Sequence, residues 1–304
     1  MNRPLQPHTR PLSTIALVTP SFNTAPYLAE TLESVLLQGY PALEYVVVDG
    51  GSTDGSVQIL ERYRERLHAL VAEPDDGHAD AINKGFGLTS GSIMGWINSD
   101  DLLHRDALAT VDAVFAAFPQ VDWITGIPTT ALGGGREDEG TEFRVKAARR
   151  FTYGDFLAGD FRWLQQESTF WRRSLWDRAG GRLDTSLRLA VDFDLWMRFF
   201  RHARLHTVDA LIGAFRRREG QRSALLMDEY LAEVDAVTRR ERAMLASGAI
   251  EPERSALERS WDGGMRARLR RRVRPDRFIA DVPSDEIQAA LLRRWADQIT
   301  QGGT

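Results

Sequence analysis

Residues 93–101, IMGWINSDD, join a short apolar run directly to two adjacent carboxylates. A continuous apolar run of this length is typical of a strand that is buried on both faces. Two carboxylates at the end of such a strand repel each other and resist removal from water. Asp100 and Asp101 are therefore candidate ligands of a divalent cation that also holds a polyphosphate. A purely structural alternative is that they cap the helix expected to begin near His104 or Arg105.

The composition is that of a globular protein with no dominant charge. The chain has 304 residues, 43% hydrophobic and 27% charged, a formal net charge of -4 and no cysteine. This length fits one large α/β domain with an appendage, or two modest domains. The charge balance argues against nucleic acid as a partner, and the lack of cysteine excludes disulfides and thiolate metal sites. Residues 1–13 carry no apolar signal-peptide core, and no apolar run reaches the ~20 residues of a membrane span, so we predict a cytoplasmic protein.

Short apolar runs alternate with helical patterns in the first part of the chain. We predict strands at residues 15–19, 45–48, 69–72 and 93–97, and the spacing of the intervening apolar residues is helical. Strands that alternate with helices at this interval imply right-handed crossovers between parallel strands. The predicted fold class is therefore α/β, with a Rossmann-like, doubly wound, mostly parallel sheet.

Polar side chains gather where these predicted strands end. In doubly wound sheets, ligands bind outside the carboxyl ends of the strands. The residues that fall there are Ser21, Asn23, Asp49, Asp100 and Asp101. The loops contain no GxxxxGK[ST] pattern, and Ser90 stands where a GxGxxG pattern would need its last glycine. The sequence thus disfavours a P-loop NTPase and a dinucleotide-dependent dehydrogenase.

One carboxylate lies on the apolar side of a predicted helix at about residues 191–202. Asp192 shares a face with Leu195, Trp196 and Phe199 by i, i+3, i+4 spacing. A carboxylate in such a stripe either caps the helix or projects into a cavity. Both interpretations of Asp192 stay open on the sequence alone.

The last part of the chain is predicted to be helical and increasingly basic. Between Trp261 and Arg277, apolar residues recur every fourth position, and seven arginines occupy residues 266–277. This amphipathic pattern suits peripheral contact with an anionic membrane surface, which for a cytoplasmic protein is the inner face of the membrane. Arginines on a solvated helix face are the alternative.

Six stretches, taken in order, resemble the inverting GT-A glycosyltransferases of family 2. They are TPSFN (residues 19–23), VVVDGGSTDGS (46–56), GHADAINKGF (77–86), WINSDD (96–101), QESTFWRRSLW (166–176) and VDFDLWMR (191–198). The resemblance implies a GT-A domain at residues 15–223, with a donor half at 15–130 and an acceptor half at 131–223. Residues 1–14 would then be a flexible N-terminus and residues 224–304 a helical C-terminal extension.

The resemblance also implies roles for individual residues. The donor-binding set that it implies is Pro20, Ser21, Asn23, Asp49, Asp80, Lys84, Asn98, Asp100 and Arg218. Asp101, assisted by Asp100, would hold Mg2+ or Mn2+ against the diphosphate, where the cation neutralises charge on the leaving group. Asp192 would be the base that removes the proton of the acceptor hydroxyl, which gives inversion at the anomeric carbon.

The chain departs from the family pattern at three positions. Gly50 stands where many relatives have a second aspartate, so we expect a different contact with the edge of the base. Asn98 replaces the first aspartate of the DxD-type element and suits either a neutral oxygen ligand or a supporting contact to the metal ligands. Arg218 stands in a lid segment that often carries histidine; an arginine cannot bind the metal but can clamp a diphosphate.

The function expected from the sequence is transfer of a sugar from a nucleotide-diphosphate donor, a UDP-sugar by preference. The acceptor would be a hydroxyl of a saccharide or lipid-linked saccharide in cell-surface polysaccharide synthesis. One alternative is a sugar nucleotidyltransferase, which needs a glycine-rich basic loop after the first strand, whereas the loop here reads PSFNTAPYL. Another is a catalytically silent binding module, which would have lost the carboxylates at 100, 101 or 192.

Overall fold

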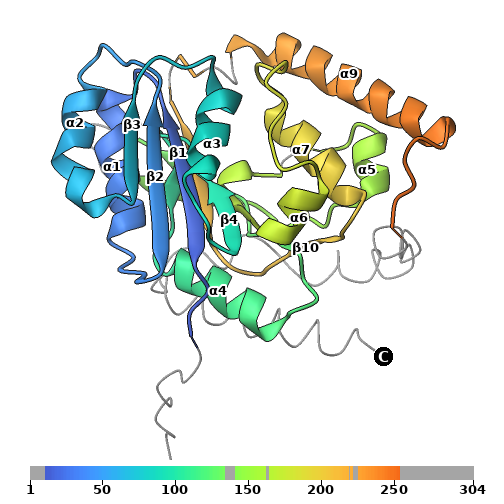
Figure 1. The fold of residues 1–304 in the computed structure, drawn as a ribbon, viewed down its shortest axis with the longest axis horizontal. Helices are drawn as coiled ribbons and strands as arrows, with labels where there is room; N and C mark the ends of the chain where they lie inside the picture. Colours follow the sequence, from blue (N-terminus) through green and yellow to red (C-terminus); the bar gives the residue numbers. More distant parts are fainter. Residues whose placement is uncertain (1–10, 134–140, 162–163, 219, 222–224, 254–304) are drawn as a thin grey trace, which may run out of the picture.

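The structure is a computed structural model that describes residues 11–133, 141–161, 164–218, 220–221 and 225–253 (Figure 1). Most of the predicted N-terminal segment, 1–14, lies outside the described residues, as does the extension beyond residue 253. The basic stretch from Trp261 to Arg277 is therefore not described, and its contact with a membrane stays a prediction. Within the described residues, no helix is long and apolar enough to cross a membrane.

A seven-stranded sheet with the strand order β10-β6-β9-β4-β1-β2-β3 forms the centre of the molecule. Its strands are β1 (Ile15–Ser21), β2 (Leu43–Asp49), β3 (Ala69–Ala72), β4 (Ile93–Trp96), β6 (Trp123–Thr125), β9 (Thr169–Arg172) and β10 (Leu205–Thr207). Neighbouring strands pair in parallel except at β9, which runs antiparallel to both β4 and β6. The predicted doubly wound, mostly parallel sheet is confirmed.

The direction of winding reverses between β1 and β4. The chain adds β2 and β3 on one side of β1 and then returns to place β4 on the other side. The pairing of β1 with β4 ends at Val18 and Trp96, with one further hydrogen bond from Ile97 N to Val18 O at 2.9 Å. Pro20, which has no N–H to donate, lies beyond the end of this pairing. The two strands therefore separate at their carboxyl ends, where ligands of doubly wound folds bind.

Helices cover both faces of this sheet. They are α1 (Ala25–Leu36), α2 (Ser56–Tyr63), α3 (His78–Gly87), α4 (Ala107–Ala117), α5 (Tyr153–Leu157), α6 (Arg173–Arg178), α7 (Val191–Phe200) and α9 (Met227–Ala246), with 3-10 turns at η1 (Arg64–Arg66) and η2 (Gln166–Ser168). Ile15 and Leu17 of β1 pack in one core with α1, α2 and α4, while Ala16 and Val18 pack in a second core with α3, α6 and α7. β1 is thus buried on both faces, as its apolar run predicts.

A smaller, four-stranded sheet has the order β5-β11-β7-β8. Its strands are β5 (Leu102–Leu103), β7 (Thr129–Leu132), β8 (Glu142–Val145) and β11 (Gly213–Arg217). β5 follows the Asp100–Asp101 pair directly and pairs antiparallel with β11. This pairing brings the residues after Gly213 against the two aspartates, although more than a hundred positions separate them in the sequence.

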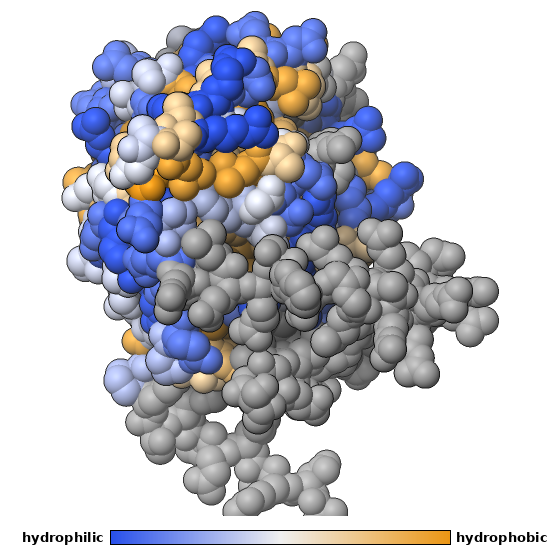
Figure 2. All heavy atoms as spheres, turned by 90° about the vertical axis from the view of Figure 1, so that its right-hand side faces the viewer, coloured by the Kyte–Doolittle hydropathy of each residue, from blue (hydrophilic) through white to orange (hydrophobic). Residues whose placement is uncertain are grey.

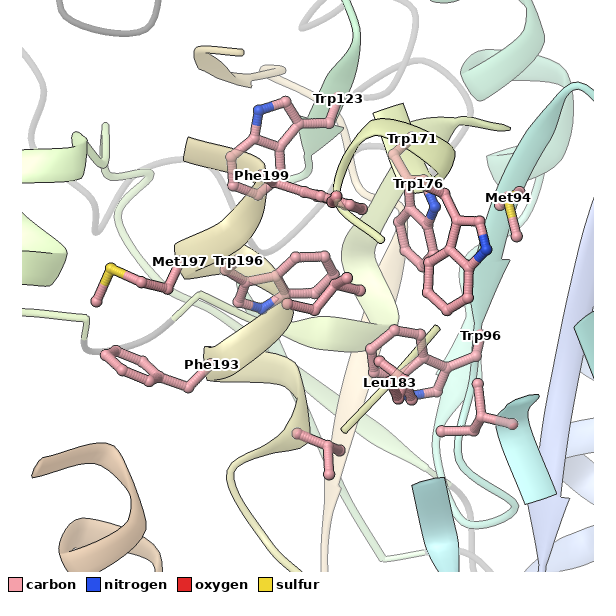
Figure 3. Close-up of a cluster of buried hydrophobic side chains, with 14 of the residues drawn as sticks. Met94, Trp96, Trp123, Trp171, Trp176, Leu183, Phe193, Trp196, Met197 and Phe199 are labelled. Atoms are coloured by element: carbon pink, nitrogen blue, oxygen red, sulfur yellow. The ribbon is translucent and has the colours of Figure 1, made fainter. Parts of the chain in front are cut away.

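An aromatic cluster fixes α7 to the main sheet (Figure 3). Trp196 of α7 stacks on Trp96 of β4 at 5.7 Å between centroids and meets Trp171 of β9 edge-on at 5.6 Å. Phe199, one turn further along α7, meets Trp123 of β6 edge-on at 5.3 Å. All five rings are at most 1% exposed. The helix that carries Asp192 is therefore held against three strands at once.

Helix α9 packs onto this same core. Its Val234 and Val237 are buried in the cluster that includes α7. Its Glu241 is 1% exposed, forms an ion pair with Arg201 and accepts a hydrogen bond from the hydroxyl of Tyr153 at 2.5 Å. Residues 227–246, which fall within the predicted helical C-terminal extension, thus contribute side chains to the same core as α7. On the face of the molecule in Figure 2, a band of hydrophobic residues runs between hydrophilic ones.

We expect the Glu241→Ala substitution to lower the free energy of unfolding by about 3–5 kcal/mol, because it leaves the mostly buried Arg201 without its partner. Urea denaturation at pH 7 measures this change. The control is Asp235→Ala, which removes an ion pair to Arg239 whose two side chains are about two-thirds exposed, with an expected loss below about 1 kcal/mol. Equal, small losses in both variants would show that Glu241 does not anchor α9.

Candidate active site

Asp49 lies at the carboxyl end of β2 and is completely buried. Its Oδ1 accepts hydrogen bonds from the backbone N–H of Gly51 at 3.1 Å and of Ser52 at 2.8 Å. Its Oδ2 accepts from the hydroxyls of Ser21 at 2.9 Å and Ser52 at 2.7 Å. A carboxylate has about four acceptor positions, and protein donors fill all of them here. Asp49 and Ser21, which were predicted to bind the donor, therefore hold the loop in shape. The carboxylate of Asp49 has no free acceptor position left for a ligand.

Asn23 links the loops that follow β1 and β2. Its backbone adopts the left-handed region, with φ of 52°, which asparagine tolerates better than most residues. Its side-chain oxygen accepts a hydrogen bond from Thr53 N at 2.9 Å, and its own N–H donates to the hydroxyl of Ser52 at 2.8 Å. The two loops thus form one platform at the end of the β1–β2 pair.

Asp80 and Lys84 lie one turn apart on α3, near the ends of β2 and β3. Lys84 Nζ is 3.0 Å from Asp80 Oδ2 and 3.8 Å from a carboxylate oxygen of Glu73. Burial raises the pKa of Asp75, in the loop before α3. The negative charges of Asp80 and Asp49 also raise it, and the positive charge of Lys84 lowers it. The predicted pair therefore lies at the same edge of the sheet as Asp49. Asp75 interacts electrostatically with Asp49 and with both members of the pair.

Asp100 and Asp101 lie at the end of β4 and contact two arginines. Arg218 Nε is 2.7 Å from Asp100 Oδ2. Arg216, whose side chain is fully buried, donates its backbone N–H to Asp101 Oδ1 at 2.8 Å and its Nε to the carbonyl of Asp100 at 2.7 Å. Asn98 Nδ2 donates to Asp101 Oδ2 at 3.1 Å. Neither aspartate caps a helix, because Asp106 is the N-cap residue of α4.

Negative charge exceeds positive charge around these aspartates. Asp101 is 1% exposed, and burial, together with the charges of Glu167 and Asp100, raises its pKa well above the usual value. Burial, with the charges of Asp192 and Asp100, raises the pKa of Glu167 to about 8. Arg218 and Lys146 offset only part of the negative charge of this group, and a divalent cation would supply further compensation.

The oxygen atoms available here fit a hard cation. The buried side-chain oxygens of Asn98 and Glu167, Oδ1 and Oε1 respectively, accept no hydrogen bond from the residues that the structure describes. Among the same residues, no three His, Cys, Asp or Glu side chains form a complete metal cage. Mg2+ commonly binds through one or two carboxylates plus substrate phosphates, so a complete protein cage is not required.

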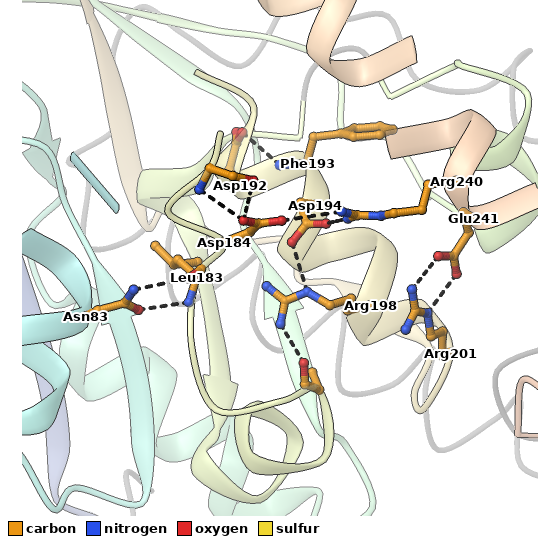
Figure 4. Close-up of polar contacts among 12 residues, drawn as sticks. Asn83, Leu183, Asp184, Asp192, Phe193, Asp194, Arg198, Arg201, Arg240 and Glu241 are labelled. Atoms are coloured by element: carbon orange, nitrogen blue, oxygen red, sulfur yellow. Dashed lines mark hydrogen bonds and ion pairs between the residues drawn. The ribbon is translucent and has the colours of Figure 1, made fainter. Parts of the chain in front are cut away.

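Asp192 lies in the first turn of α7, and Ala190 is the N-cap residue. Its Oδ1 accepts a hydrogen bond from the adjacent N–H of Phe193, at 2.8 Å, and burial raises its pKa to about 6. Asp194, two positions later, is instead held by Arg198 at 2.9 Å and by Arg240 of α9 (Figure 4). Of these two aspartates, Asp192 is the one whose carboxylate is free of an ion pair, so it is available for proton transfer.

Helix α9 supplies the polar contacts that the start of α7 lacks. The carboxylate of Glu233 accepts hydrogen bonds from the backbone N–H groups of Arg188 at 3.0 Å, Leu189 at 2.9 Å and Ala190 at 2.8 Å. Tyr230, one turn earlier, lies close enough to Asp192 for the charge of Asp192 to raise its pKa. The side of the site that holds the candidate base is thus built partly from residues beyond 223.

Sequence reasoning assigned no role to Glu167, Arg216 or Glu233. Glu167 could have been found by the signal that identified Asp100 and Asp101, because it is also a carboxylate next to an apolar run, QESTFW. Arg216 and Glu233 carry no such local signal. Their roles depend on contacts with residues 101 and 188–190, which lie far away in the sequence.

The raised pKa of Glu167 predicts how stability changes with pH. The native protein holds this proton up to about pH 8, whereas an unfolded chain releases it near its ordinary value of about 4.3. The stability contributed by this proton is complete below the pKa of the unfolded state, about 4.3, and is lost as the pH rises through the pKa of the native state, about 8. In EDTA, the free energy of unfolding of the wild type should therefore fall relative to that of Glu167→Gln between pH 5 and pH 8.

Urea denaturation at several pH values in this range measures the difference. Glu142→Gln, at an exposed position of β8, is the control and should parallel the wild type. A Glu167→Gln curve that also runs parallel to the wild type would contradict the raised pKa.

Solved structures share this fold at low sequence identity. Residues 1–349 of S. aureus TarS in complex with UDP-GlcNAc match with a TM-score of 0.59 and 22% identity, over 75% of this chain and 66% of that one. The mannosyltransferase PcManGT from Pyrobaculum calidifontis, in complex with GDP-Man and Mn2+, matches with a TM-score of 0.56 and 23% identity, over 79% and 68%. The expected GT-A architecture, a mixed α/β fold around a large, mostly parallel sheet, is confirmed by this likeness.

Several glycosyltransferases are similar in sequence over part of their length. The putative teichuronic acid biosynthesis glycosyltransferase TuaG of Bacillus subtilis is 37% identical over 97 residues, which are 31% of this chain and 38% of TuaG. GlyG of Streptococcus pneumoniae is 34% identical over 32% of this chain and 33% of its own. The match thus spans little more than a third of either relative. An uncharacterized glycosyltransferase of Mycobacterium tuberculosis is 31% identical over 61% of this chain and 68% of its own.

The family model described as glycosyl transferase family 2 matches residues 16–170, which are just over half of the chain. This range includes all but the first residue of β1, the Asp100–Asp101 pair and Glu167. The chain therefore belongs to glycosyl transferase family 2.

Proposed function

We propose that the protein is a metal-dependent, inverting glycosyltransferase that uses a UDP-sugar. The acceptor would be a hydroxyl of a saccharide or lipid-linked saccharide, in the synthesis of a cell-surface glycan. The observation that carries the proposal is that the buried Asp100–Asp101 pair and the unpaired carboxylate of Asp192 interact electrostatically with one side chain, that of Glu167. The names of the relatives support it, because they include a teichuronic acid biosynthesis enzyme and a structure bound to UDP-GlcNAc.

The donor would bind across the gap between β1 and β4. The nucleoside would lie against the platform formed by the loops at Asn23 and Asp49, and the diphosphate would extend toward Asp100. A bound Mg2+ or Mn2+ would neutralise charge on the diphosphate as it leaves. Asp101, Asp100 and the side-chain oxygen of Asn98 are the residues that would hold this cation.

Arg218 would change partners when the donor binds. Its guanidinium now pairs with Asp100 and lies 5.3 Å from the centre of the Tyr27 ring. Because the cation and Arg218 both need the Asp100 carboxylate, binding of the cation would release the guanidinium to a phosphate oxygen. Arg218 is thus proposed to clamp the diphosphate.

Asp192 would act as the base. Its carboxylate must be ionised to take the proton from an acceptor hydroxyl as that oxygen attacks the anomeric carbon. Direct attack from the side opposite the leaving diphosphate inverts the configuration at that carbon. Glu233 and the aromatic cluster around Trp196 would keep the carboxylate in position during this step.

The two alternative functions have less support. The loop after β1, PSFNTAP, lacks the glycines and basic residues that a nucleotidyltransferase needs to hold a triphosphate. A silent binding module has no need of a partly buried carboxylate without an ion-pair partner, such as that of Asp192 among the described residues, and removing one from water is costly.

We expect a UDP-sugar to bind more tightly than GDP-, dTDP- or CMP-sugars, and only when Mn2+ or Mg2+ is present. Isothermal titration calorimetry with each donor, with and without Mn2+, tests this. Asp101→Ala should abolish the metal-dependent binding, whereas Asp228→Ala, at an exposed position of α9, should leave it unchanged. Failure of every sugar nucleotide to bind under any metal condition would refute the proposed function.

The transfer rate should rise with pH through about 6 and level off above about pH 7, because only ionised Asp192 can accept the proton. Asp192→Asn should lower the transfer rate by about 10²–10⁴-fold. Binding of UDP and Mn2+ by this variant should match the wild type, which calorimetry checks. Transfer at the native rate by Asp192→Asn would remove Asp192 from the role of base.

A further inference from the structure

Gly50, the residue after Asp49, has a carboxylate directly against its backbone. A Cβ atom at position 50 would lie 2.7 Å from Asp75 Oδ2 and 3.0 Å from Asp75 Cγ. Atoms do not approach that closely, so any side chain at position 50 would displace the carboxylate of Asp75. The space that a residue-50 side chain would enter is therefore held by a carboxylate from a different loop, the one between β3 and α3.

The two oxygens of Asp75 differ in what they bind. Oδ1 accepts a hydrogen bond from the backbone N–H of Gly77 at 2.8 Å. Oδ2 accepts none from any residue that the structure describes. The side chain is partly buried beside Asp49, whose own four acceptor positions are already filled. At the platform where the nucleoside is proposed to bind, Asp75 thus presents a fixed carboxylate with one free acceptor oxygen.

We propose that Asp75 determines which base the protein binds, by accepting a hydrogen bond from a ring N–H of the base through Oδ2. This inference rests on the proposed function, since it concerns the nucleotide of the same donor. Uracil and thymine present such an N–H at N3. Cytosine at N3 and adenine at N1 present a lone pair instead, which a carboxylate oxygen repels.

Guanine is a weaker match for this geometry. Its N1–H and N2–H donors lie side by side and are best paired by both oxygens of one carboxylate. Oδ1 of Asp75 is already engaged by the Gly77 N–H, and only Oδ2 is free. The arrangement therefore favours UDP-sugars and dTDP-sugars over GDP-sugars, and disfavours cytidine and adenosine nucleotides most.

The Asp75→Asn substitution gives a directional test, because the Gly77 N–H fixes the orientation of the new amide. The amide oxygen would stay on Gly77 N, which places the amide NH2 where Oδ2 was. A donor would then replace the acceptor that faces the base. Affinity for UDP should fall by at least about tenfold, and the ratio of CDP to UDP affinity should rise by more than that.

Calorimetric titration of UDP and CDP in the presence of Mn2+ measures both affinities. Asp76→Asn is the matched control, because it removes the same charge from the neighbouring, exposed position and should leave the CDP to UDP ratio unchanged. Thermal unfolding without ligand verifies that each variant is folded. Gly50→Ala is the second variant, since it displaces the Asp75 carboxylate without changing its charge and should also weaken UDP binding.

The outcomes separate this inference from the proposed function. A changed CDP to UDP ratio in Asp75→Asn but not in Asp76→Asn supports it. Wild-type binding of UDP and an unchanged ratio in both Asp75→Asn and Gly50→Ala overturn the inference and leave the proposed function standing. If the wild type binds no nucleoside diphosphate with Mn2+, the proposed function fails, and the role of Asp75 fails with it.

Discussion

Buried, like-charged carboxyl groups at the carboxyl end of the main sheet are the constraint on which the site depends. Asp100, Asp101 and Glu167 lie within electrostatic reach of one another, and burial favours the neutral forms of Asp101 and Glu167. The protein offsets part of this cost with the ion pair of Arg218 to Asp100 and with the backbone N–H of Arg216 on Asp101. The remaining negative charge would favour binding of the proposed divalent cation.

The second sheet positions these two arginines. β11 pairs with β5, the two-residue strand that follows the aspartates, and therefore carries Arg216 and the adjoining Arg218 to the Asp100–Asp101 pair. Arg216 also pairs with Glu30 at 2.7 Å, which links the same strand to α1. The site thus joins parts of the chain that the sequence separates by almost two hundred residues.

Helix α9 contacts the segment just before α7, the helix that carries Asp192. The described part of this helix packs against the rest of the fold through polar contacts. Glu233 accepts hydrogen bonds from the three N–H groups of residues 188–190, just before α7, and Glu241 forms an ion pair with Arg201, just after it. The aromatic cluster holds the other side of α7 against the sheet. A carboxylate at the start of that helix is consequently positioned from two directions, which a proton acceptor needs in order to meet its hydroxyl at a fixed place.

The sequence by itself determined the fold class, the order of the first four strands of the main sheet and their helices, and the edge of that sheet at which polar residues gather. These follow from local patterns: apolar runs of strand length, helical spacing, and polar residues where each run ends, as at Asp49 and Asp100. Only the tertiary structure decided which of those residues are free to act. Asp49 is saturated by its own loop, whereas Asp75 keeps an open oxygen because Gly50 leaves it room. The hydrogen bond from Ser21 to Asp49 and the close approach of Asp75 to Gly50 join residues of different strands or loops, so no local pattern could have revealed them.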